Sequence, residues 1–397
     1  MHGKPEIGYP GLLRLFSDRL ALMAKPTLEI WVGTRKGAFV FRSADRKRWE
    51  QEGPHFAGLE VHHVAQDPRE PNRYYAAVNS PCFGPHLHAS TDGGKTWALS
   101  EKGLEVKGIE GASLTRIWNI APGAVDDPGG VWLGADPGVL FRSEDNGTSW
   151  KMVKGLSMHA SRSKWNPGAG GMMVHSIQPL GRGRVIVGIS AAGAFRTSDN
   201  GKTWAPFNKN VLADFAPEKF PEVGQCVHKL LAHPRLKNDL YQQNHCGVYR
   251  ATFNGKQWTD ISEGLPSRFG FAAAVPAAEN KTIFTIPIGS PQNRWVADGK
   301  LRVARSRDAG RTWELLSKGL PEKECFDLIV REAMSADDRD PAGVYFGTQG
   351  GTVYYTRNAG KSWDRLASHL PPVYSVTVAT QIQAVQTQTV QTQTEQS

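Results

Sequence analysis

Apolar and polar residues alternate along this chain in short runs, and turns rich in proline and glycine separate the runs. Between residues 61 and 100 the runs are VHHVAQ, YYAAV, HLHAS and TWALS. Alternation with a period of two is typical of half-buried antiparallel strands, and no long amphipathic helix intervenes. The pattern predicts an all-β protein built from units of four short strands, and it excludes a parallel α/β fold.

An eight-residue box recurs within these units. Four near-copies are STDGGKTW (90–97), SEDNGTSW (143–150), TSDNGKTW (197–204) and SRDAGRTW (306–313). Weaker copies are TRNAGKSW (356–363), SADRKRW (43–49) and ATFNGKQW (251–258). The final tryptophans recur about every 50 residues, which is typical of one supersecondary unit per copy. Seven copies predict a seven-bladed β-propeller.

Each box predicts a tight turn between the two outer strands of its blade. The aspartate accepts hydrogen bonds from the backbone of the turn, the glycine adopts a positive φ, and the tryptophan covers apolar neighbours. We therefore expect Trp97, Trp150, Trp204 and Trp313 to be structural residues.

The first unit lacks an innermost strand, and a suitable strand lies at the other end of the chain. The segment LPPVYSVTVAT (370–380) alternates with a period of two. We expect it to complete blade 1 beside residues 28–50, because closure by both ends removes open sheet edges. The predicted organisation is a partly disordered extension (1–26), the propeller (27–380) and a disordered Gln/Thr-rich tail (381–397). Both Met1 and Met23 are candidate start sites.

Composition narrows the class of protein. The chain has 47 Lys+Arg against 38 Asp+Glu, a net charge of +9, and 40% hydrophobic residues, which excludes a disordered chain. The basic residues are scattered, so no nucleic acid partner is expected. No apolar run is long enough to span a membrane. Arg14, Asp18 and Arg19 interrupt the stretch that superficially resembles a signal peptide, and four cysteines are too few for a disulfide framework. These features predict a cytoplasmic protein.

The boxes resemble the Asp-box, or BNR, repeat of sialidases, sortilin-type receptors, xyloglucan hydrolases and the photosystem II assembly factor. The resemblance covers residues 27–380. GTRKGAFVF (33–41), followed by PHFAGLEVHHVAQDP (54–68), is similar to bacterial propellers described as glycosyl hydrolases or exo-sialidases. It implies the propeller fold and says little about chemistry. Sialidases resemble six-bladed propellers with an Arg-Ile-Pro motif. This chain has seven boxes, and its nearest match to the Arg-Ile-Pro motif is TRIWN (115–119). We therefore do not assign the sialidase catalytic residues to this chain.

In such a propeller the boxes lie on one face. The connections between blades and the loops between second and third strands lie on the other, which we call the mouth face. Four mouth-face arginines could hold a carboxylated group or be solvated surface residues: Arg35, Arg116, Arg162 and Arg268. Trp118 and Trp165 could stack on a sugar, although Trp118 fits channel packing equally well. His245 is a further ligand-binding candidate.

The innermost strands predict a ring of polar side chains around the channel mouth. His62 and His228 lie six residues before the prolines that close their strands, and Trp118 and His175 lie four residues before theirs. Allowing for this two-residue gap, the four positions are equivalent on blades 2 to 5, and Asp327 fits the same place on blade 7. His175, His228 and Asp327 are the candidate catalytic acids and bases. His62, His175 and His228 are the candidate ligands of a divalent metal. Cys226 lies two residues before His228. The alternative is that the ring only lines a wet channel.

Two functions follow from this pattern. The first is binding of a small polar or anionic, carbohydrate-like ligand at the channel mouth, in a glycosyl-hydrolase-like enzyme or a binder derived from one. Glycoside hydrolysis would need two carboxylates about 5 to 10 Å apart. The second is a non-catalytic scaffold that binds a protein partner. The even spacing of the boxes favours a monomer.

Overall fold

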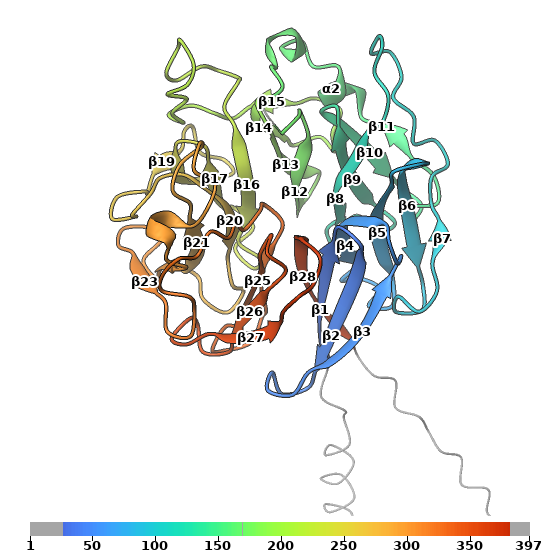
Figure 1. Ribbon diagram of the computed structural model, residues 1–397. Helices are drawn as coiled ribbons and strands as arrows, with labels where there is room; N and C mark the ends of the chain where they lie inside the picture. Colours follow the sequence, from blue (N-terminus) through green and yellow to red (C-terminus); the bar gives the residue numbers. More distant parts are fainter. Residues whose placement is uncertain (1–26, 169, 382–397) are drawn as a thin grey trace, which may run out of the picture.

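Seven antiparallel four-stranded sheets make up the structure and surround a common centre (Figure 1). The computed structural model describes residues 27–168 and 170–381. This confirms the predicted all-β, seven-bladed propeller. The predicted N-terminal extension (1–26) and nearly all of the predicted tail (382–397) lie outside the described residues.

Within each sheet the strands run from the channel outward. Blade 1 contains β28 (Val373–Gln381), β1 (Thr27–Thr34), β2 (Gly37–Ser43) and β3 (Glu50–His55), and blade 2 contains β4 (Glu60–Gln66), β5 (Tyr74–Ser80), β6 (Gly84–Ser90) and β7 (Ala98–Leu99). Blade 3 contains β8 (Arg116–Pro122), β9 (Val131–Asp136), β10 (Val139–Ser143) and β11 (Lys151–Met152). Blade 4 contains β12 (Val174–Gly181), β13 (Arg184–Ile189), β14 (Gly193–Thr197) and β15 (Ala205–Pro206).

Blades 5 to 7 follow the same order. Blade 5 contains β16 (Val227–Ala232), β17 (Asp239–Asn244), β18 (Gly247–Thr252) and β19 (Thr259–Asp260). Blade 6 contains β20 (Gly270–Ala274), β21 (Ile283–Pro287), β22 (Val303–Ser306) and β23 (Glu314–Leu316). Blade 7 contains β24 (Met334–Ala336), β25 (Val344–Gly347), β26 (Val353–Thr356) and β27 (Asp364–Ala367). Short helices α2 (Lys154–Ser157), η1 (Arg162–Lys164) and η2 (Ala297–Gly299) lie in mouth-face loops. No helix among the described residues combines the length and hydrophobicity needed to cross a bilayer.

Burial explains which strands are inner and which are outer. The middle strands are buried almost throughout, as in β9, where five of the six residues are buried. The outermost strands are short and exposed, as in β7. Each innermost strand also contacts the innermost strands of the two adjacent blades. The cores therefore lie between neighbouring blades, because each sheet buries both of its faces.

The two ends of the described chain pair with each other, as predicted. β28 pairs antiparallel with β1, with Val378 opposite Ile30 and Val376 opposite Val32. The two strands also lie side by side in Figure 1. The backbone of Thr380 further bonds to the Gln66 side chain of blade 2. Blade 1 is thus held by both ends of the propeller, and the ring has no open edge there.

The boxes form nearly identical turns between the third and fourth strands. The Ser143 hydroxyl accepts the N–H of Gly147 at 2.8 Å, and the Asp145 carboxylate accepts the N–H of Ser149 at 2.8 Å. The same two bonds recur in the boxes that start at residues 90, 197, 306 and 356. Gly147 has φ +85°, and a Cβ there would lie 2.8 Å from the Tyr75 ring. Glycine is therefore required both by the turn and by close packing on the preceding blade.

Three box tryptophans also join adjacent blades. Trp150 donates its indole N–H to the carbonyl of Ser100 at 2.9 Å, just beyond the outer strand of the preceding blade. Trp258 and Trp313 make the equivalent bonds, at 2.7 Å, to Phe207 and Ile261. Each of these three tryptophans therefore ties its own blade to the preceding one through a hydrogen bond.

Candidate functional site

The innermost strands carry a bulged residue at the channel mouth. The pairing of the first and second strands of each blade skips one residue at His62, Trp118, His175 and His228, and the same shift occurs at Tyr374 and around Phe271. The predicted equivalence of His62, Trp118, His175 and His228 is therefore observed. A bulge redirects the side chain of the extra residue, and here it brings different side chains to one end of the channel.

On blade 7 the equivalent residue is Glu332, and the predicted placement of Asp327 is corrected. The turn that ends the innermost strand is closed by the N–H of Asp67, His233 or Asp337, each five residues after His62, His228 or Glu332. Asp327 instead lies in the loop before β24, where its carboxylate accepts the N–H of Gly350 at 2.7 Å. Blade 7 has no proline to mark the strand end, which is why counting in the sequence misplaced this position.

His175 and His228 link adjacent blades. His175 Nε2 lies 2.9 Å from the Val227 carbonyl, and His228 Nδ1 lies 2.6 Å from the Gly270 carbonyl. Both side chains are buried, and burial holds the pKa of each imidazole well below its ordinary value. Both rings are therefore neutral, and one nitrogen of each is engaged by the next blade.

A cavity of about 170 Å³ opens at the channel mouth, and we call it the mouth pocket. Its lining comes from blades 1, 2, 3 and 7 and consists of His62, Arg116, Trp118, Val330, Arg331, Glu332, Gln349 and Tyr374. Three of these were predicted as site residues, namely His62, Arg116 and Trp118. The mouth pocket thus combines the bulge residues of blades 1 to 3 with Glu332, the equivalent residue of blade 7, and with polar groups next to them.

One wall of the mouth pocket is aromatic. The rings of His62 and Tyr374 stack with their centroids 4.8 Å apart, and the Trp118 ring lies 5.2 Å from His62. The Arg116 guanidinium lies 5.5 Å from the centre of the Trp118 ring. Glu60 contacts His62 Nε2 at 3.3 Å, and this hydrogen bond lowers the pKa of the Glu60 carboxyl to about 2. The ionised carboxylate thereby orients His62 within the aromatic wall.

Two guanidinium groups at the mouth pocket lack a carboxylate partner. Among the described residues, neither Arg116 nor Arg331 forms an ion pair, and the Nε of each is buried without a hydrogen-bond partner. Arg331 reaches toward blade 4, where its Nη2 lies 3.3 Å from the Ser190 hydroxyl. The indole N–H of Trp118 is also buried without a partner. The three residues that carry these unpaired donors all line the mouth pocket.

The carboxylate of Glu332 is held from across the channel. Lys229 of blade 5 forms an ion pair with Glu332 Oε2, and both side chains are buried. The other oxygen, Oε1, has no partner. A buried ion pair of this kind constrains both groups, since losing either partner leaves an uncompensated charge.

The remaining predicted ligand-binding residues lie outside the mouth pocket. Arg162 donates to the carbonyls of Pro137 and Gly138, and Trp165 is buried against Phe195. Arg268 pairs with Asp260 on the outer part of blade 5. Arg35 is exposed in the loop between β1 and β2. Arg162 and Trp165 are therefore occupied by loop and core contacts.

Metal-ligating side chains come together in a different set from the predicted one. Within residues 27–168 and 170–381, the group with metal-binding spacing is Cys226, His228 and His245, whose ligand atoms all lie within 4.8 Å of one another. His62 and His175 do not belong to it. Cys82, Cys226, Cys246 and Cys325 are all free thiols, as expected from the cysteine count.

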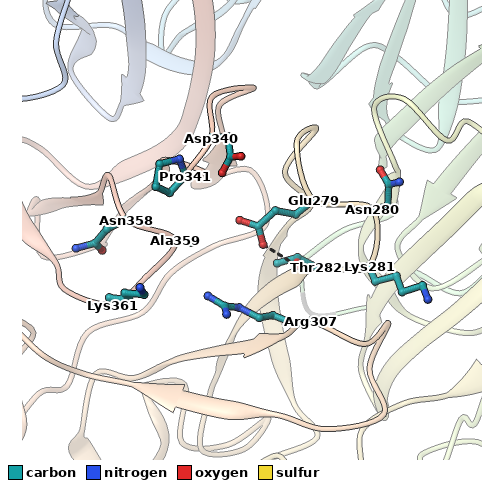
Figure 2. Close-up of a pocket in the computed structure, with 10 residues that line it drawn as sticks. All are labelled: Glu279, Asn280, Lys281, Thr282, Arg307, Asp340, Pro341, Asn358, Ala359 and Lys361. Carbon is teal, nitrogen blue, oxygen red and sulfur yellow. Dashed lines mark hydrogen bonds between the residues drawn. The ribbon is translucent and has the colours of Figure 1, made fainter.

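Larger grooves lie on the box face. One of about 550 Å³ lies between blades 6 and 7 and is lined by Glu279, Lys281, Arg307, Asp340 and Lys361 among others (Figure 2). Its residues come from box turns and from the turns between first and second strands. No bulge residue contributes to it. Volume alone therefore does not identify the site, whereas the mouth pocket is distinguished by lining residues that carry unpaired donors.

Five mouth-pocket residues were missed at the sequence level: Val330, Arg331, Glu332, Gln349 and Tyr374. Tyr374 was recoverable, because it lies in the predicted closing strand at the register of His62. Asp337 could have located Glu332, since it occupies the strand-end position of Asp67. Arg331 and Gln349 leave no local signal, because they reach the mouth pocket from loops.

Comparison with known proteins agrees with the fold. No protein-family model matches the chain. A xyloglucanase of Hypocrea jecorina is 23% identical over 276 residues, which cover 66% of this chain and 30% of the xyloglucanase. Among solved structures, an ancestral GH74 enzyme superposes with a TM-score of 0.53 at 14% identity, covering 85% of this chain and 40% of the enzyme. YCF48 from Cyanidioschyzon merolae superposes with a TM-score of 0.53 at 14% identity, and the match covers 81% of this chain and 95% of YCF48. The chain is therefore a seven-bladed β-propeller similar to GH74 enzymes and to YCF48.

Proposed function

We propose that the protein binds a small carboxylated sugar or a similar hydroxy acid in the mouth pocket. The observation that carries the proposal is the set of three buried N–H donors without protein partners, on Arg116, Trp118 and Arg331. Buried polar groups are almost always hydrogen-bonded. The three residues that carry these donors line the same cavity, which supports a bound acceptor there.

The charge of these donors favours an anion. Guanidinium groups pair with carboxylates through two parallel hydrogen bonds, and Arg116 and Arg331 are not neutralised by an ion pair within the described chain. The free oxygen of Glu332 adds an acceptor for a ligand hydroxyl. The aromatic wall of His62, Trp118 and Tyr374 supplies a flat apolar surface for a sugar ring.

The size of the cavity limits the ligand. Drug-sized ligands occupy pockets of roughly 300–1,000 Å³, whereas the mouth pocket measures about 170 Å³. It admits one sugar-sized group and not a length of polysaccharide. The polysaccharide named for the xyloglucanase relative would therefore contribute at most a terminal residue.

The proposal is binding and does not include hydrolysis. Glycoside hydrolysis needs one carboxyl group as acid and another as base or nucleophile. Glu332 is engaged by Lys229 and Glu60 by His62, while Asp327 is bound to Gly350 outside the mouth pocket. Each of these three carboxylates already has a structural partner.

Calorimetric titration with glucuronate and glucose tests the proposal, because the two sugars differ in the carboxylate; galacturonate, gluconate and N-acetylneuraminate extend the acid series. We expect an acid to bind and glucose not to bind. Arg116→Ala should weaken binding at least ten-fold, which corresponds to about 1.4 kcal/mol. Arg307→Ala, on the box face, is the matched control and should bind normally. The proposal is wrong if none of the acids binds, or if Arg116→Ala binds as well as the wild type.

A second candidate function is docking of a protein partner on the mouth face. Four phenylalanines stand exposed in loops of this face: Phe83 (82%), Phe326 (70%), Phe220 (54%) and Phe215 (51%). Exposed aromatic side chains are enriched at protein interfaces. Cross-linking that captures one stoichiometric partner, and loses it in a Phe83→Ser/Phe326→Ser variant, would favour docking over ligand binding.

A further inference from the structure

We propose that Cys226, His228 and His245 bind a thiophilic metal ion, Zn²⁺ or Cu⁺, at the blade 5 corner of the channel mouth. The ligand atoms of the three side chains lie within 4.8 Å of one another. Atoms around a tetrahedral zinc are separated by roughly 3.3–3.8 Å, given bond lengths of 2.0–2.3 Å. Closing the site therefore requires shifts of about 1 Å, which small side-chain rotations provide.

The backbone of blade 5 brings these ligands together. Val227 and Asn244 form the last regular pair of β16 and β17, and beyond them the N–H of His245 donates to the Cys226 carbonyl at 3.0 Å. Cys226 and His245 are thus opposite each other at the end of one hairpin. The bulge at His228 supplies the third ligand from the same strand as Cys226.

His228 has the surroundings of a metal-binding histidine. Its Nδ1 donates to the Gly270 carbonyl at 2.6 Å, so Nε2 is the nitrogen left with a free lone pair. Backbone carbonyls fix metal-binding imidazoles in this manner. The ring is stacked on Phe271 with centroids 4.5 Å apart and meets Phe269 edge-on. His228 is therefore held in one tautomer and one orientation before any ion binds.

The donor set determines the class of ion. One thiolate with two imidazoles suits Zn²⁺ and Cu⁺ and disfavours Mg²⁺ and Ca²⁺, which prefer oxygen ligands. Three protein ligands leave a fourth position open, as in zinc sites that exchange a ligand. The neighbouring thiol of Cys246 is separate, because it is buried and donates to Asp214 at 3.0 Å.

The site is distinct from the mouth pocket. None of its three residues lines that cavity. Arg331, which does line the mouth pocket, lies close enough to Cys226 and His228 to interact with them electrostatically. Metal binding therefore does not depend on the proposed acid-binding function, and either can fail alone.

Titration of the reduced full-length chain with Co²⁺, followed by competition with Zn²⁺ and separately with Cu⁺, tests the inference. We expect one equivalent of Co²⁺ with thiolate-to-cobalt charge-transfer absorption in the near ultraviolet. Whichever competing ion displaces cobalt at the lower concentration identifies the preferred one.

Matched variants decide which residues hold the ion. Cys226→Ser should abolish the charge-transfer band, and His245→Gln should weaken binding at least ten-fold, while Cys246→Ser should behave as the wild type. Each variant should keep the melting temperature of the metal-free wild type and its acid binding. Failure of the wild type to bind cobalt, or equal binding by Cys226→Ser, would overturn the inference.

Discussion

Two positions recur around this propeller: the box turn on one face and the bulge of the innermost strand on the other. The box repeats the same residue types and the same hydrogen bonds in blade after blade. The bulge position, counting Glu332 as its equivalent on blade 7, carries side chains that range from indole to carboxylate: His62, Trp118, His175, His228, Phe271, Glu332 and Tyr374. One position repeats its chemistry and the other repeats only its geometry.

The difference follows from where the two positions point. Each box turn meets only its own blade and the preceding one, so every copy solves the same local packing problem. The bulge residues of all blades converge on one axis. Because they share a single space, different side chains create an asymmetric arrangement, with unpaired cations and aromatic rings at blades 7 and 1 to 3 and thiol and imidazole groups at blade 5.

The largest expected difference in the free energy of unfolding is between replacing a tryptophan of a box turn and replacing a tryptophan of a bulge. Trp150→Ala removes a buried indole and its hydrogen bond to Ser100, and should lower the free energy of unfolding by about 3–5 kcal/mol. Trp118→Ala, at a half-buried bulge, should cost less than half of that and should abolish acid binding. Urea unfolding measures both. Equal destabilisation by the two variants would contradict the division between faces.

Replacing Glu332 tests whether a residue at the channel mouth also contributes to the stability of the fold. Glu332→Ala leaves Lys229 buried without its partner and should cost about 3 kcal/mol. The double variant Lys229→Met/Glu332→Met should recover much of this loss, because an apolar pair replaces the ion pair. Thermal and urea unfolding of the three proteins check the expectation, and an Glu332→Ala variant as stable as the wild type would refute it.

The smallest expected effect on the free energy of unfolding is that of low pH, which acts through the aspartates of the box turns. Hydrogen bonds from the side chain and then the backbone of Thr203 lower the pKa of Asp199 to about 2, and Thr312 does the same for Asp308. A carboxyl group whose pKa is lowered on folding stabilises the fold above its unfolded pKa, near 4, and loses this contribution as pH falls toward 2. Both aspartates are exposed, so solvent screens the effect.

The double variant Asp199→Asn/Asp308→Asn should flatten the decline in unfolding free energy between pH 4 and pH 2. Asparagine already occupies this place in the last box, where Asn358 accepts the N–H of Ser362 at 3.0 Å. Urea titrations across this pH range measure the slope. Slopes that match in the wild type and the variant would show that the box carboxylates contribute nothing to acid sensitivity.

Much of the fold was predictable from the sequence because its determinants are local or periodic. A box turn is specified by residues within eight positions, and seven boxes at a constant interval specify seven blades. The closing strand at 370–380 was recognisable from its alternation. The equivalence of His62, Trp118, His175 and His228 also followed from counting, since the strand ends were marked by prolines.

The composition of the site was decided only by the tertiary structure, because it depends on contacts between distant residues. Asp327 and Glu332 are five residues apart, and the structure shows that Glu332 lines the mouth pocket whereas Asp327 lies in the loop before β24. Arg162 and Trp165 matched the expected residue types, yet neighbouring loops and the core occupy them.

The sequence by itself therefore determined the architecture and the face that carries the site, since short-range turns and a regular repeat encode both. The hairpin of β16 and β17 brings the three candidate metal ligands of blade 5 together. Which arginines stay unpaired and which carboxylate Lys229 holds were determined by closure of the ring. Closure brings residues a hundred or more positions apart to one axis, and no local pattern records those pairings.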